Sequence, residues 1–76
     1  MKRLTEEQFL SLNEKPSRYA KVIIREEEIE FPTHYVVFEE GDNFESIDVT
    51  NVTEFVRQDS HFQFDKATVE IIKIKN

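Results

Sequence analysis

The sequence predicts a small α+β domain that spans residues 1–76, with an N-terminal helix packed on an antiparallel sheet of about four to five strands, a central acidic β-hairpin and a short second helix. Three observations favour this class. Helix-capping patterns occur in the first and last thirds of the chain, and runs of β-branched and aromatic residues lie between and after them. The composition of seven Phe and two Tyr against one Gly and two Pro is typical of a chain that folds.

The first helix is expected from about Glu6 to Asn13. Thr5 and Gln8 stand three positions apart, so the Thr5 hydroxyl can accept a hydrogen bond from the Gln8 amide while the Gln8 side chain reaches back to the Thr5 amide. Acidic residues in the first turn suit the positive end of the helix dipole. Pro16 disfavours the helical conformation at the residue before it, so the helix ends before this proline.

A first strand is expected over Arg18–Glu26, which is rich in β-branched and aromatic residues. Its apolar side chains point to both faces, so the strand belongs in the interior of the sheet. Residues 27–31 then alternate between carboxylates and apolar side chains. This segment either extends the first strand or begins a second one, and Pro32 ends the pairing because it has no amide to donate.

A central hairpin is predicted from two strand-like runs, Thr33–Glu40 and Phe44–Thr50, on either side of Gly41. Glycine and its neighbours Asp42 and Asn43 supply the positive-φ conformations that a tight turn needs. Carboxylates flank this glycine on both sides. The sequence therefore predicts a hairpin with an acidic tip.

The last third of the chain is expected to hold a second helix and a closing strand. Asn51 and Glu54 form a second capping pattern, and apolar residues at helical spacing predict a helix from Val52 to Gln58. The remaining elements are expected to be a polar connection at Gln58–His61, alternating residues at Phe62–Phe64, a turn at Asp65–Lys66 and a strand at Ala67–Lys75.

The two faces of the predicted sheet pose a packing problem. Three of the expected strands are apolar on both faces, yet two short helices are expected to cover only one face. Either the sheet curls over on itself into a small barrel, or a second copy or a partner covers the other face.

The net charge of −6 comes from one stretch, Glu26–Asp48, which holds nine carboxylates and no Lys or Arg. Because these acids alternate with apolar residues, we expect the sheet to hold them in fixed positions. The nine acids are Glu26, Glu27, Glu28, Glu30, Glu39, Glu40, Asp42, Glu45 and Asp48.

The residue types that carry enzyme chemistry are sparse. The chain has no Cys, its two His stand far apart, and its one Gly is flanked by carboxylates that would repel phosphate. Residues 59–61 read Asp-Ser-His but lack the glycine elbow of a hydrolase nucleophile. We therefore expect a non-enzymatic protein without metal or cofactor. The chain has no signal-peptide core and no membrane-spanning apolar run, so we expect it in the cytoplasm and not in a membrane.

The acidic hairpin is the predicted partner-binding site. Fixed carboxylates can dock on a basic surface built for nucleic acid, and Phe38 or Phe44 could anchor the contact. In size, acidity and absence of catalytic residues the chain resembles the small inhibitor proteins that phages and mobile elements make against nucleoproteins. The charges expected to contact the partner are Glu39, Glu40, Asp42 and Glu45.

Three alternatives stay open. The acids could serve only solubility and protection of sheet edges. The protein could be an assembly module that homodimerises through an apolar sheet face. Direct nucleic-acid binding is disfavoured by the sign of the charge, although the basic N-terminal third contains Tyr19 as a stacking candidate.

Overall fold

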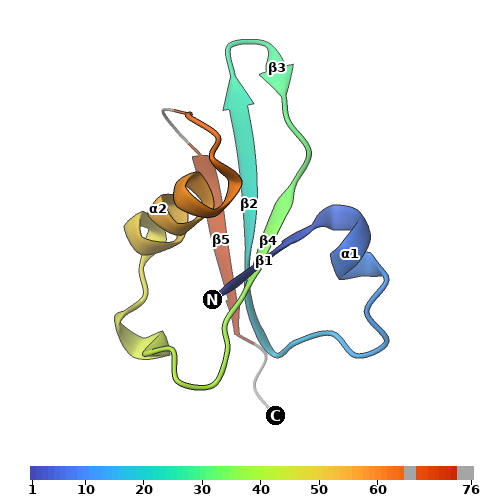
Figure 1. Ribbon diagram of the computed structural model, residues 1–76, viewed down its shortest axis with the longest axis vertical. Helices are drawn as coiled ribbons and strands as arrows, with labels where there is room; N and C mark the ends of the chain where they lie inside the picture. The colour runs from blue at the N-terminus through green and yellow to red at the C-terminus, as the bar shows by residue number, and fades with distance from the viewer. Residues whose placement is uncertain (65–66, 74–76) are drawn as a thin grey trace.

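The computed structural model describes residues 1–64 and 67–73 and shows an α+β domain (Figure 1), which confirms the predicted fold class. Within these residues an antiparallel sheet of five strands packs with two α-helices. The elements are β1 (Lys2–Thr5), α1 (Glu6–Leu10), β2 (Arg18–Glu26), β3 (Ile29–Glu30), β4 (His34–Val37), the 3-10 turn η1 (Phe44–Ser46), α2 (Val49–Ser60) and β5 (Ala67–Lys73).

Strand β2 is the centre of the sheet. It pairs with β4 on one edge and with β5 on the other, and β1 adds to the outer side of β4. Every pairing is antiparallel. Strand β3 pairs with the far end of β2 and projects beyond both helices (Figure 1). The apolar pattern on both faces of Arg18–Glu26 therefore predicts its central position correctly.

Strands β3 and β4 follow one another along the same edge of β2, with a break at Pro32. Before the break, the Phe31 amide donates to the Ile24 carbonyl at 3.0 Å. After it, His34 stands opposite Val22. This edge thus holds one residue more than β2 does, which is a β-bulge. The bulge ends the regular ladder where a proline has no amide to donate.

The main core lies between α2 and one face of the sheet. Alternate residues of β2 point to this face, and Ala20, Val22 and Ile24 are all buried there. Val52 and Val56, one helical turn apart on α2, are also fully buried against it. The buried cluster consists of Ala20, Val22, Ile24, Val36, Phe38, Val52, Val56 and Phe64.

The short helix α1 packs on the opposite face through Phe9. Its ring stacks on Tyr35 at 4.0 Å between centroids and lies 4.8 Å from Tyr19. Both tyrosines point away from α2 because they alternate with the core residues of their strands. The two helices therefore cover opposite faces, and the expectation that they would share one face is wrong. β1 and β5 do not pair with each other in the described chain, so the sheet is open there and not a barrel.

The predicted central hairpin is wrong in its second strand. Residues 44–46 form η1, and Val49 and Thr50 begin α2. Asp48 explains this, because its carboxylate accepts from the Asn51 amide at 2.8 Å while the Asn51 side chain accepts from the Asp48 amide at 3.1 Å. This capping box starts the helix one turn earlier than the predicted cap at Asn51. The hairpin that does form joins β2 to β3.

Several predicted boundaries also shift. The Thr5 capping box is present, but α1 ends at Leu10 and β1 precedes it without having been predicted. The expected polar connection at 58–61 is largely the last turn of α2. The closing strand is confirmed through Lys73, whereas the predicted turn at 65–66 and residues 74–75 lie outside the described chain.

Lys15 closes the C-terminal end of α1. Its Nζ donates to the carbonyl oxygens of Phe9, Leu10 and Leu12 at 3.1, 3.0 and 2.9 Å. These carbonyls lie at a helix end, where partners from the helix itself are lacking and a cation is favoured by the dipole.

Replacing Lys15 by methionine should lower the free energy of unfolding by about 1 kcal/mol, because the ammonium is lost while most of the side-chain length is kept. Urea denaturation measures the effect. Lys2→Met, at an exposed position, removes the same charge and is the control. Equal midpoints for the two variants would contradict a capping role for Lys15.

Candidate interaction surfaces

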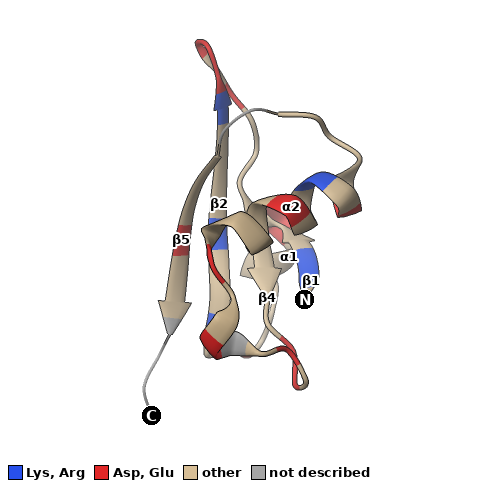
Figure 2. Cartoon of the chain, turned by 90° about the vertical axis from the view of Figure 1, so that its left-hand side faces the viewer, with Lys and Arg blue, Asp and Glu red and all other residues tan. Residues whose placement is uncertain are grey.

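The acidic stretch divides between two ends of the molecule. Glu26–Glu30, named here the acidic arm, forms the tip of the β2–β3 hairpin. Glu39–Asp42, named the acidic turn, follows β4 at the other end of the longest axis, along which the molecule extends 38 Å (Figure 2). One block in the sequence is therefore two separate surfaces in the fold.

The acidic turn has a well-defined backbone. The Asp42 amide donates to the Glu39 carbonyl at 3.1 Å, and the Glu39 amide donates to the Asp42 carboxylate at 2.8 Å. Gly41 has φ +101°, in the left-handed region that glycine adopts without strain. Two hydrogen bonds therefore join the ends of the turn, at Glu39 and Asp42.

The α-amino group of Met1 contacts two carboxylates of the acidic turn. It lies 2.8 Å from Asp42 Oδ2 and 3.6 Å from Glu39 Oε1. The hydrogen bond from this ammonium group, followed by that from the Glu39 amide, lowers the pKa of Asp42 below its usual range. The hydrogen bond to Asp42 raises the pKa of the amino group, against the opposing effect of burial. Part of the negative charge of the turn is therefore neutralised within the molecule.

One of the two predicted aromatic anchors, Phe38, is not exposed beside the acids. Phe38 is buried in the core, and its amide donates to the Arg18 carbonyl at 3.2 Å. Phe44 begins η1, and its side chain lies outside the described atoms. Glu40 and Glu45 are exposed. A hollow of about 470 Å³ beside the turn is lined by Pro16, Ser17, Arg18, Phe38, Glu39, Glu40 and Asp42.

The acidic arm projects from the body of the domain. Glu27 occupies the left-handed region with φ +55°, which lets the chain reverse between β2 and β3. Glu30 lies 3.5 Å from Arg25, and both side chains are well exposed. Ile29 stands between these acids with 59 % of its surface exposed.

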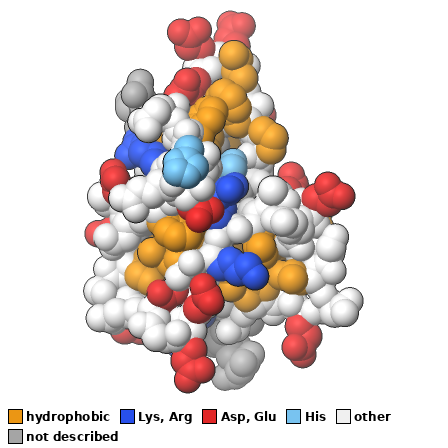
Figure 3. All heavy atoms as spheres, in the orientation of Figure 1, with side chains coloured by type: hydrophobic (Ala, Val, Ile, Leu, Met, Phe, Trp, Pro, Cys, Tyr) orange, Lys and Arg blue, Asp and Glu red, His pale blue; other side chains and the backbone are white. Residues whose placement is uncertain are grey.

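An apolar strip runs from the arm tip toward the end of α2. It consists of Ile29, Phe31, Pro32 and Phe62, and the rings of Phe31 and Phe62 meet edge to face at 4.8 Å. Figure 3 shows hydrophobic side chains continuing from the tip to the histidines at mid-height. At its lower end the strip enters a hollow of about 290 Å³ lined by Arg3, Ile24, Phe31, Pro32, His34, Ser60 and Phe62.

A small polar network closes the lower end of the strip. Arg3 donates from Nε to Asp59 Oδ2 at 2.8 Å and from Nη1 to His34 Nδ1 at 3.1 Å. The nearby carboxylate balances the charge of Arg3. Burial, and secondly the charge of Arg3, lowers the pKa of His34. The contact at Nδ1 fits a neutral ring that accepts there and carries its proton on Nε2.

The stability of the domain should fall as the pH drops below about 6.5, the usual pKa of histidine. A lowered folded-state pKa means that the unfolded chain binds the proton more readily, so the contribution of His34 is complete above that pH and is lost below it. Urea denaturation at pH 7.5 and pH 5.5 should show a smaller drop for His34→Asn than for the unmodified protein. His61→Asn is the matched control, since His61 is exposed with φ +56°, a conformation that asparagine tolerates. An unchanged pH dependence in His34→Asn would contradict this assignment.

The Asp-Ser-His run at 59–61 does not bring its three side chains together. Asp59 contacts Arg3, and the Ser60 hydroxyl donates to the Val56 carbonyl and accepts from the Phe62 amide at 3.2 Å. His61 is the exposed C-cap of α2. Within the described residues no group of three or more His, Asp or Glu side chains is placed to hold a metal ion.

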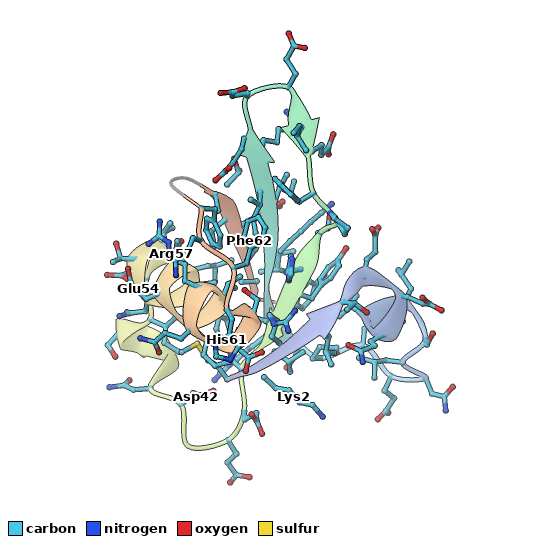
Figure 4. All side chains as sticks on the ribbon, turned by 45° about the horizontal axis from the view of Figure 1, so that its top comes forward. Lys2, Asp42, Glu54, Arg57, His61 and Phe62 are labelled. Carbon is cyan, nitrogen blue, oxygen red and sulfur yellow. The ribbon has the colours of Figure 1, made fainter. Side chains whose placement is uncertain are left out.

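Two basic residues of the N-terminal third, and the predicted stacking candidate Tyr19, make separate contacts within the domain. Lys15 caps α1, Arg3 binds Asp59, and Tyr19 packs against Phe9. Outside this third, Arg57 on α2 also pairs within the domain, with its Nη1 3.0 Å from Glu54 Oε1 (Figure 4). The predicted stacking candidate for nucleic acid is therefore half-buried and engaged with another ring.

Of the two alternatives left open for residues 27–31, the structure confirms the second strand, which is β3. Sequence reasoning did not identify the arm and the strip as a surface separate from the acidic turn. The signal that could have found them is the polar Glu27-Glu28 pair between two strand-like runs, since two-residue connections are typical of hairpins. No helix in the described part of the chain is long and apolar enough to cross a membrane. No protein-family model, curated protein or solved structure matches the chain.

Proposed function

We propose that the protein is a non-enzymatic binding module that docks on a basic surface of another protein. The observation that carries this proposal is the placement of its carboxylates, which sit on two ordered reversals of the chain at opposite ends of the fold. A surface that binds nucleic acid has the matching charge. An inhibitor from a phage or mobile element that imitates nucleic acid is the narrower form of the same proposal.

Electrostatic attraction would mainly increase the rate at which the module associates with its partner. A net charge of −6 steers the module toward a basic surface and makes the rate sensitive to salt. Asp42 contributes less than the sequence implies, because the Met1 amino group already binds it. At the end of the domain that carries the acidic turn, the candidates for contact with a partner are Glu39, Glu40 and Glu45. The acidic arm supplies the candidates at the opposite end.

Affinity purification from cell lysate tests the proposal with two matched variants. Glu39→Lys/Glu40→Lys reverses the charge of two side chains on the acidic turn, and Glu27→Lys/Glu28→Lys does the same on the acidic arm. Each double variant changes the net charge of the protein from −6 to −2. The unmodified protein should recover a basic protein that salt releases, and at least one variant should lose it. Recovery that neither variant nor salt changes would contradict the proposal.

The second candidate is an assembly module that homodimerises through the sheet face beneath α1. Phe9 is the one buried residue of this helix, and Ile23 and Ile72 on the same sheet face are half-buried and lie outside the core cluster of the described residues. Light scattering decides between the candidates. A dimer that Ile72→Lys converts to a monomer supports this reading, and a monomer at every concentration removes it.

A further inference from the structure

We propose that the apolar strip and the acidic arm together bind an extended segment of a partner protein in which basic and hydrophobic residues alternate. This inference rests on the proposed function and names the surface and the chemistry of its partner. The juxtaposition that carries it is an exposed hydrophobic strip whose upper end is surrounded by carboxylates.

The strip has the form of a docking site. Ile29 and Phe31 alternate with acids on β3 and its extension, so both point to the same face as the core. Ile29 is largely exposed, and the ring of Phe31 packs against that of Phe62. The same two rings line the hollow of about 290 Å³. A hydrophobic side chain could therefore cover Ile29 while a second one enters the hollow.

The edge of the arm favours an extended occupant. β1 pairs only with His34–Val37, so in the described chain no strand lies beside the outer edge of β3. An open edge can accept one more strand through main-chain hydrogen bonds. Pro32 lacks an amide and limits such pairing to the residues above it. The added strand is thus expected to run along the arm.

Charge selects a basic occupant. Glu26, Glu27, Glu28 and Glu30 stand on the arm, and Arg25 directly before them lies 3.5 Å from Glu30. At the lower end Arg3 is paired with Asp59, so it does not present an unbalanced positive charge. A second copy of the chain is disfavoured, because symmetric contact through this edge would oppose one acidic arm to another.

Fluorescence anisotropy with the full chain tests the inference. The probe is a fluorescein-labelled heptapeptide of alternating lysine and leucine, and the control is the same peptide with serine in place of leucine. The lysine–leucine peptide should bind at low salt about tenfold more tightly, as burial of roughly one aliphatic side chain predicts. Absence of binding, or equal binding of the two peptides, would overturn the inference.

Three variants locate the site. Ile29→Ser should weaken the lysine–leucine peptide by about tenfold and leave the lysine–serine peptide unchanged, since it removes one exposed hydrophobic side chain. Glu27→Lys/Glu28→Lys should weaken both peptides more than Glu39→Lys/Glu40→Lys does. Circular dichroism checks that each variant is folded, which is expected because these side chains are exposed.

The outcomes separate the two proposals. If charge reversal on the acidic turn weakens peptide binding and charge reversal on the acidic arm does not, the proposal that the strip binds the peptide is refuted. The proposal of an acidic binding module then still stands. If both reversals weaken binding equally, or Ile29→Ser has no effect, the arm is not the site. If neither reversal nor salt changes binding, both proposals fail. Peptide-induced shifts of the amide resonances of residues 29–31, with the acidic turn unaffected, would support the strip directly.

Discussion

Replacing Val52 by aspartate is expected to unfold the domain. Val52 is fully buried in α2 and packs in the core cluster beneath the sheet. A carboxylate placed there without a partner costs several kcal/mol. A domain of 76 residues has a total stability of about 4–11 kcal/mol, so this single change removes most or all of it.

Val49→Asp provides the matched control for this experiment. Val49 lies three residues earlier on the same helix and is 48 % exposed. It occupies the first turn of α2, where an acid suits the helix dipole. Far-UV circular dichroism and urea denaturation should show a folded Val49→Asp protein and an unfolded Val52→Asp protein. Similar transitions for both would mean that α2 does not anchor the core as described.

Local chemistry was enough to predict the elements that depend on neighbouring residues. The capping box at Thr5 and Gln8 forms as predicted, because both of its hydrogen bonds lie within four residues. β2 has the predicted bounds, Arg18–Glu26, since apolar residues on both faces specify a central strand. These features need no information from the rest of the chain.

Two local patterns compete in the second strand of the predicted hairpin, and packing decides between them. Residues 44–50 alternate like a strand and follow a glycine turn. In the fold, Asp48 caps α2, and burial of Val52 and Val56 against the sheet fixes the helix. Tertiary packing therefore overrides the period-two pattern. β1 was missed for a related reason, because a four-residue edge strand carries almost no signal of its own.

The sequence identifies the acidic residues of the candidate site but does not predict where the fold places them. The nine acids are contiguous in sequence, yet β2, β3 and β4 carry them to opposite ends of the domain. Phe38 was predicted as a possible anchor because aromatic side chains often dominate binding energy, but it is buried in the core cluster. Two acidic ends along a 38 Å axis would suit an elongated basic surface better than a single pocket.

Replacing Phe9 by alanine is expected to cost about 3–5 kcal/mol, the usual cost of removing a buried phenylalanine side chain. Phe9 is 5 % exposed, stacks on Tyr35 and is the one buried residue of α1. Its loss should free the helix and uncover the sheet face opposite α2, because five helical residues are not stable alone.

Leu10→Ala is the control for this variant, since Leu10 belongs to the same helix but is 62 % exposed. Thermal denaturation should show a large drop in midpoint for Phe9→Ala and little change for Leu10→Ala. The near-UV signal of the tyrosines should weaken only in Phe9→Ala, because Tyr19 and Tyr35 lose the ring between them. If the two variants had equal midpoints, α1 would not be held by Phe9, and the uncovered face would already be open in the native protein. If Phe9→Ala remained folded and became dimeric, the exposed tyrosines would show that this face can associate, and that α1 normally prevents it.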